Sequence, residues 1–94
     1  MNANEHKKII GNRIIHARKA NGWTIKTLAE RTGFGIARIG NWEQGTRSPG
    51  PLEAKVLAQE LKVAASWLLY LSDDPHGERV EEIIAFYEDI SCDS

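Results

Sequence analysis

Charged side chains are distributed unevenly along this 94-residue chain. Residues 1–50 carry nine Lys and Arg against three Asp and Glu, a balance of +6. Residues 51–94 carry three against ten, a balance of −7, so the formal net charge is only −1. A basic half of this kind is suited to binding the phosphates of a polyanion, with the acidic half held away from it. The small net charge argues against strong non-specific binding of nucleic acid.

Side chains capable of metal binding or catalysis form no recognisable site in the sequence. The histidines, which we interpret as isolated surface residues, and the cysteine lack the spacing of metal ligands: His6, His16, His76 and Cys92. The Glu81-Glu82 pair is typical of a solvated helix face rather than of an acid–base pair. We therefore predict neither an enzyme nor a cofactor.

The length and composition indicate one small soluble domain. Ninety-four residues, of which 41% are hydrophobic, can form a modest core without disulfides. No apolar run reaches the length of a membrane span, and the start of the chain lacks the apolar part of a signal peptide. A single cysteine cannot form an internal disulfide. These features predict a cytoplasmic protein with no membrane association.

Helical periodicity and turn residues predict an all-helical chain. The first helix is expected over residues 6–21, with Ile10, Ile14 and Ala17 inward. Three basic residues of this helix are expected to point outward: Lys7, Arg13 and Lys19. Thr24 is the expected N-cap of a second helix that ends at Thr32. Residues 33–35 then form a turn, and a third helix covers residues 36–44.

Three further helices are expected in the second half. Pro51 suits the first position of a helix over residues 51–62, whose apolar stripe is Leu52, Val56, Leu57 and Leu61. A short helix over residues 65–71 follows, with Ala64 at a position where a polar cap is usual. Asp74 is the expected cap of a last, acidic helix over residues 76–90.

A helix-turn-helix pattern occupies residues 22–45. Small Ala29, beside Leu28, permits close approach of a second helix, and Gly33 suits the left-handed residue that ends the first. Ile39 and Trp42 are three apart, on one face of the second helix. The pattern is completed by Glu43 and Gly45, and matching blocks lie on both sides: Arg13-Ile14-x-x-x-Arg18-x-x-x-Gly22, Pro49, Leu57-Ala58-x-x-Leu61-x-Val63 and Trp67-Leu68-Leu69.

Over residues 10–71 the chain resembles the phage-repressor-like (XRE) family of five-helix DNA-binding domains. The resemblance implies a helix-turn-helix DNA-binding domain over residues 1–72. The acidic C-terminal helix within residues 73–94 lies outside the family core, and we expect it to serve as a dimerisation element. The resemblance further implies a transcriptional regulator, a prophage-type repressor or a Cro-like protein, that binds operator DNA as a homodimer. The third helix would lie in the major groove.

By position, the resemblance assigns base reading to residues of the third helix: Gly35, Ile36, Ala37, Gly40 and Asn41. Among these only the Asn41 side chain forms hydrogen bonds, whereas family members generally place several polar side chains here. Ile36 and Ala37 are suited to contacts with thymine methyl groups. We therefore expect limited direct readout of sequence.

Phosphate contacts are expected from the start of the second helix and from the third helix and its following loop: Thr24, Lys26, Arg38, Asn41, Thr46 and Arg47. Ile25 replaces the glutamine that the family generally uses to bind a phosphate and to brace the recognition helix. We expect it to pack beside Trp23 instead. The resemblance also pairs Arg18 with Glu43 in a partly buried ion pair, and we expect core positions for Trp23, Trp42 and Trp67.

The expected dimer interface combines the end of the domain with the last helix: Trp67, Tyr70, Leu71, Val80, Ile83, Ile84 and Tyr87. Packing of these residues within one chain is the alternative. A rival function also remains, an antitoxin or adaptor that binds a protein partner through the acidic C-terminal half. The sparse third helix favours this rival, and the basic first half favours double-stranded DNA.

Overall fold

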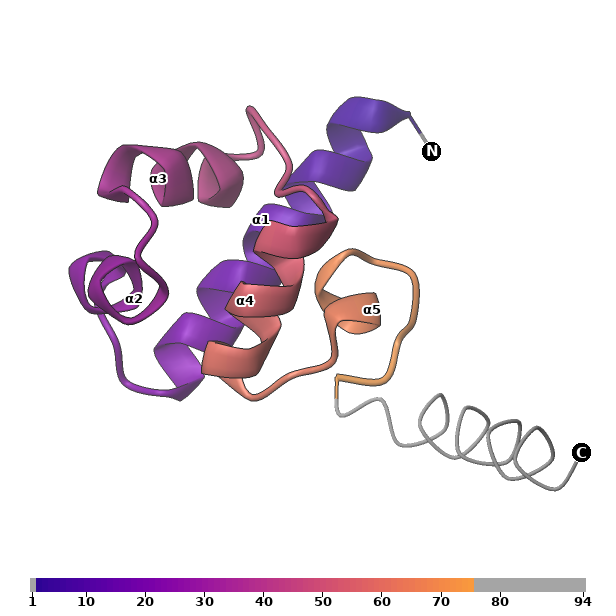
Figure 1. The fold of residues 1–94 in the computed structure, drawn as a ribbon. Coiled ribbons are helices and arrows are strands. Elements are labelled where there is room, and N and C mark those ends of the chain that lie inside the picture. The colour runs from indigo at the N-terminus through magenta and orange to yellow at the C-terminus, as the bar shows by residue number, and fades with distance from the viewer. Residues whose placement is uncertain (1, 76–94) are drawn as a thin grey trace, which may run out of the picture.

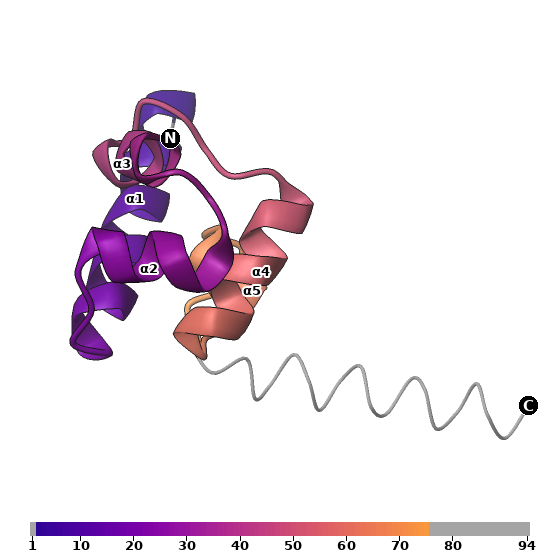
Figure 2. The ribbon, with the colours of Figure 1, turned by 60° about the vertical axis from the view of Figure 1, so that its left-hand side comes forward.

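The computed structural model describes residues 2–75, which form five helices and no strand (Figure 1). The helices are α1 (Ala3–Ala20), α2 (Ile25–Thr32), α3 (Ile36–Gln44), α4 (Pro51–Leu61) and α5 (Ala65–Leu68). In two views α2 and α3 lie on one side of the molecule and α5 on the other (Figures 1 and 2). The predicted all-helical class is confirmed. The expected helix over residues 76–90 lies outside the described residues.

Helix α1 begins three residues earlier than predicted. The Asn2 side chain accepts a hydrogen bond from the Glu5 backbone N–H at 2.9 Å, which caps the helix, and the Glu5 carboxylate lies in the first turn. At the other end Asn21 is the cap, and its amide donates to the carbonyl of Leu61 at 3.2 Å. The earlier start adds residues 3–5 to the helix, so His6, Lys7 and Lys8 follow its first residues.

The predicted bounds of α2 and α3 are confirmed because local signals decide them. Thr24 Oγ accepts from the Thr27 N–H at 3.1 Å at the start of α2. Gly33, with φ of 81°, ends α2, and Gly45, with φ of 80°, ends α3. Both are left-handed conformations that favour glycine. A sharp turn therefore separates two short helices of fixed length.

Helix α4 differs from the prediction in its buried face. Leu52 is 79% exposed, and the buried residues of α4 are Ala54, Leu57, Ala58 and Leu61. Leu52 lies about 140° around the helix from Leu57, which places it on the solvent side. The predicted start at Pro51 is confirmed, and the Glu53 carboxylate accepts from the Gly50 N–H at 2.8 Å.

Helix α5 ends at Leu68, earlier than the predicted Leu71. Tyr70 adopts a left-handed conformation with φ of 60°, and its N–H donates to the Trp67 carbonyl at 3.0 Å. The Leu71 N–H donates to the Ser66 carbonyl at 2.7 Å. These two bonds form the helix-ending arrangement that glycine usually completes. Tyrosine takes this role here, and the expected continuation of the helix was wrong.

One core joins the five helices. Its buried hydrophobic residues are Ile10, Ile14, Ala17, Leu28, Ala29, Ile39, Trp42, Ala54, Leu57, Ala58, Leu61, Trp67 and Leu68. Two of the three predicted core tryptophans, Trp42 and Trp67, belong to it. Trp23 is only half-buried and lies under the Arg31 guanidinium, 4.3 Å from the ring centroid.

Helix α1 and the end of α3 approach each other closely. A Cβ placed on Gly11 would lie 2.5 Å from the carbonyl oxygens of both Trp42 and Glu43. At Gly45 a Cβ would lie 3.1 Å from the Cα of Lys8. Main-chain atoms form these contacts, so side-chain rotation cannot relieve a clash. Gly11 therefore sets the separation of α1 from α3.

Replacing Gly11 by alanine is expected to lower the free energy of unfolding by about 1–3 kcal/mol, because the added methyl overpacks a rigid contact. Gly40 is the matched control, since a Cβ there meets only Ile25 Cδ1 at 3.9 Å. Gly40→Ala is expected to raise the free energy of unfolding by about 0.5–1 kcal/mol. Urea denaturation followed by circular dichroism gives both values. Equal stabilisation by the two substitutions would contradict the close approach at Gly11.

Candidate nucleic-acid interface

The first turn of α3 is exposed while the opposite face of the helix is buried. Ile39 is 0% and Trp42 is 2% exposed, so these two side chains hold α3 in the core. Gly35, Ala37 and Arg38 are exposed, and Ile36 is 49% exposed. Four of the predicted interface residues thus lie together at one end of the helix, and the surface they form is mainly apolar.

Asn41 closes the loop that follows α3. Its backbone carbonyl accepts from the Thr46 N–H at 3.1 Å and from the Thr46 hydroxyl at 3.0 Å. The Asn41 Oδ1 also lies 3.4 Å from that hydroxyl. Within residues 2–75 the Asn41 Nδ2 makes no hydrogen bond, so the half-buried amide retains donors for a ligand. The backbone N–H and the hydroxyl of Thr46 are therefore both used to close this loop.

Ile25 of α2 lies close to Gly40 of α3. Its Cδ1 lies 3.9 Å from the position of a Cβ on Gly40, which is half-buried. Ile25 packs against the hydrophobic core, and the glycine opposite leaves room for its aliphatic side chain.

The predicted phosphate-binding side chains differ in whether they already have an ion-pair partner within the protein. Arg38 Nη1 lies 3.2 Å from Glu53 Oε2, and the guanidinium lies 5.9 Å from the Phe34 ring centroid. Lys26 and Arg47 are exposed and form no side-chain ion pair within residues 2–75. These two side chains are free to meet a phosphate, whereas Arg38 must first exchange its carboxylate partner.

Arg18 and Glu43 join α1 to the end of α3. Nε and Nη2 of Arg18 donate to the two carboxylate oxygens at 2.7 and 3.0 Å, and Nη1 donates to the Trp23 carbonyl at 2.9 Å. The two side chains are 14% and 9% exposed. Hydrogen bonding to Glu43 raises the pKa of Arg18 above its ordinary value, against the opposing effect of burial. The arginine end of this two-pronged contact is therefore charged at every physiological pH.

The sequence profile of the helix-turn-helix family matches residues 14–68, more than half of the chain. The chain belongs to this family, in its phage-repressor-like (XRE) branch. It is therefore a DNA-binding transcription regulator. Its structure is similar to that of the restriction-modification controller protein C.AhdI from Aeromonas hydrophila, with 27% sequence identity and a TM-score of 0.63. The match covers 66% of this chain and 94% of that one. No curated protein sequence matches the chain.

Arg13 connects the helix-turn-helix domain to the segment after α5. The expectation that Arg13 points outward was wrong. Its Nη1 donates to the carbonyls of Trp67 and Ser72 at 2.5 and 2.7 Å, and its guanidinium lies 4.8 Å from the Tyr70 ring centroid. Nη2 also lies 3.5 Å from the carboxylate of Asp73. The helical spacing could have predicted this inward position, because Arg13 is three residues after buried Ile10.

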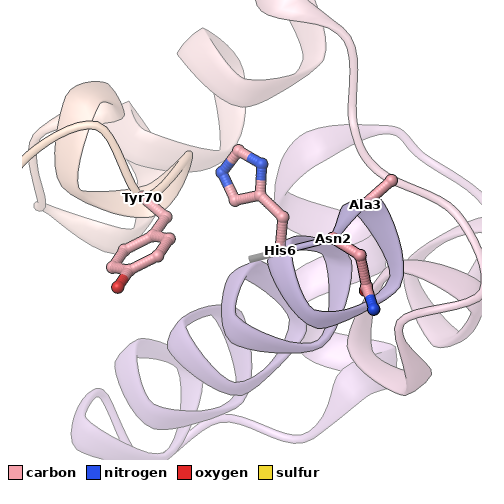
Figure 3. A pocket seen from close by; sticks show the side chains of 4 residues that line it. All are labelled: Asn2, Ala3, His6 and Tyr70. Carbon is pink, nitrogen blue, oxygen red and sulfur yellow. The ribbon is translucent and has the colours of Figure 1, made fainter.

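His6 makes a second contact to that segment and is not the isolated surface residue we expected. Its Nε2 lies 3.1 Å from the Leu69 carbonyl oxygen, and its ring meets the Tyr70 ring edge-on, with centroids 5.6 Å apart. Figure 3 shows the His6 ring rising from α1 toward Tyr70. A pocket of about 270 Å³ beside them is completed by Asn2 and Ala3.

The predicted dimer residues are only partly described. Trp67 is 8% exposed and belongs to the core, so it offers little surface to another chain, in contrast to the expectation. Tyr70 is half-buried and Leu71 is 72% exposed. The remaining four, Val80, Ile83, Ile84 and Tyr87, lie outside the described residues, as do His76 and Cys92.

Two further surveys of residues 2–75 concern other classes of site. No three His, Cys, Asp or Glu side chains in this part of the chain are grouped closely enough to hold a metal ion. His16 is exposed, with its ring 6.4 Å from that of Trp67. None of the described helices has both the length and the apolar character of a membrane span.

Removing one partner of the Arg18–Glu43 pair is expected to lower the free energy of unfolding by about 3–5 kcal/mol, because the other charge stays buried without its partner. The exposed pair of Arg31 and Glu60, 3.9 Å apart, is the control, with an expected loss below about 1 kcal/mol. Thermal and urea unfolding of Glu43→Ala and Glu60→Ala measure both. The charge-reversed double variant, Arg18→Glu with Glu43→Arg, should recover part of the loss. No recovery at all would count against the pair.

Proposed function

We propose that the protein is a sequence-specific repressor of the prophage or Cro-like kind, acting in the cytoplasm and binding operator DNA as a dimer. The observation that carries this proposal is the exposed first turn of α3, on a helix whose other face is fixed by Ile39 and Trp42. Such a helix enters the major groove without reordering. A dimer bound at an operator represses by excluding RNA polymerase from the same DNA.

The chemistry of this surface favours an uneven division of affinity and specificity. Lys26 and Arg47 are free cations that neutralise phosphates and fix the position of the duplex. Asn41 Nδ2 and the exposed Ile36 supply the direct readout, by hydrogen bonding and by contact with a thymine methyl group. Because so few polar side chains face the groove, DNA shape contributes to the choice of site.

Dimerisation through the end of the domain and residues 73–94 would place two α3 helices about 34 Å apart, one turn of DNA. The exposed Leu71 and half-buried Tyr70 support a surface in this region. The operator is then a palindrome with half-sites about one turn apart. Similarity to a solved restriction-modification controller supports a small regulator of this architecture.

The second candidate is an antitoxin or adaptor that binds a protein through the acidic half. The balance of −7 over residues 51–94 and the mainly apolar first turn of α3 favour it. The two candidates differ in one measurable property. Only the repressor retains a defined DNA sequence from a random pool.

Selection from a random duplex library at near-physiological salt tests the proposal directly. We expect enrichment of a palindrome with half-sites about one turn apart, and a protein–DNA stoichiometry of two chains per site by analytical ultracentrifugation. If the retained duplexes show no sequence enrichment over the input library, the stand-alone repressor is excluded. Isolation of protein partners of the acidic half would then follow.

Two substitutions separate readout from positioning. Asn41→Ala is expected to relax the sequence preference at one base pair of each half-site, with a discrimination loss of about 1–3 kcal/mol. Arg47→Ala is expected to weaken binding to operator and scrambled duplex alike and to flatten the salt dependence. Fluorescence anisotropy titrations over a range of salt measure both. If neither substitution changes binding, the DNA-facing surface is elsewhere on the protein.

A further inference from the structure

A basic hollow of about 520 Å³ lies beside the recognition helix, where α1, α3, α4 and the loop between α3 and α4 meet. Its lining side chains come from all four segments: Lys7, Arg38, Trp42, Arg47, Ser48 and Glu53. In Figure 1 this loop runs from the end of α3 to the start of α4. Three of the six side chains are cationic, and only one is acidic.

The hollow depends on the first turns of α1, which precede the family match at residues 14–68. These turns are held against the end of α3 at main-chain distance, as the approach of Gly45 to the Lys8 Cα requires. Lys7 is therefore fixed next to Arg47, forty residues later in the chain. If α1 began after residue 7, the hollow would lack the Lys7 side chain from its lining.

The single carboxylate of the hollow is already neutralised. Glu53 Oε1 accepts from the Gly50 N–H at 2.8 Å, and Oε2 lies 3.2 Å from Arg38 Nη1. The side chains of Lys7 and Arg47, in contrast, form no ion pair or hydrogen bond within residues 2–75. The hollow therefore holds two uncompensated positive charges next to the Ser48 hydroxyl.

We propose that Lys7 binds a backbone phosphate of the DNA duplex at this hollow, which extends the interface from the helix-turn-helix unit onto α1. This inference rests on the proposed function, because α3 must lie in the groove for a strand to pass the hollow. Lys7 is half-buried, lines the hollow and forms no ion pair within residues 2–75, so its ammonium group is available to a ligand. An ammonium group recognises the charge of a phosphate without reading the base beside it.

The test compares Lys7→Gln with Lys19→Gln in the full chain. Lys19 is an exposed lysine of the same helix, twelve residues or about 18 Å away from Lys7, so both variants lose the same net charge. Binding of a labelled operator duplex and of a scrambled duplex is measured by fluorescence anisotropy between about 50 and 200 mM salt. Thermal melting verifies that both variants retain the fold.

For Lys7→Gln we expect weaker binding than wild type on both duplexes. The ratio of its Kd to the wild-type Kd should fall about 3.5-fold between the two salt concentrations, because one lost phosphate contact lowers the slope by about 0.9. Lys7→Arg, which keeps the charge, should retain the wild-type slope. Lys19→Gln should differ little from wild type.

The outcomes distinguish this inference from the proposed function. If wild-type protein binds DNA and Lys7→Gln has the slope and affinity of Lys19→Gln, the phosphate site at Lys7 is excluded and the repressor proposal stands. If Lys7→Gln loses affinity for the operator alone, Lys7 reads sequence and the assignment to phosphate is wrong. If wild-type protein binds neither duplex, the proposed function itself fails.

Discussion

The approach of α1 to α3 at Gly11 is the constraint on which the rest of the structure depends. Main-chain atoms of Trp42 and Glu43 occupy the space that a side chain at residue 11 would take. Seven residues along the same face of α1, Arg18 binds the Glu43 carboxylate with two hydrogen bonds. The end of α3 is thus fixed at its backbone and at its side chain, and the helix has one orientation relative to α1. Because α3 is a rigid helix, the orientation of its exposed first turn is fixed as well.

A recognition helix fixed in this way needs little ordering when it binds, which lowers the entropic cost of association. This matters for a helix with few hydrogen-bonding side chains. Gly40 adds no side chain to this surface, and it leaves room for Ile25 from α2. We propose that phosphate contacts at the edges of α3 carry much of the affinity for DNA.

Local signals made the centre of the fold predictable, and long-range contacts determined what was missed. Thr24, Gly33 and Gly45 define α2 and α3 without reference to the remainder of the chain. The end of α5 depends instead on Tyr70 in a left-handed conformation, next to His6 and Arg13 from α1. No residue type near position 70 signals that turn. The hollow at Lys7 likewise arises only when α1 meets the loop after α3.

Consecutive residues of α1 therefore face two different parts of the molecule. Successive side chains on a helix are about 100° apart, so His6 reaches the Leu69 carbonyl while Lys7 reaches the hollow beside Arg47. A regular helix is stiff over so short a span, and the contacts that hold the segment after α5 also set the position of Lys7. The same segment leads into residues 73–94, which we propose for dimerisation. One turn of α1 thus connects the region that we propose for dimerisation with the site that we propose for a phosphate.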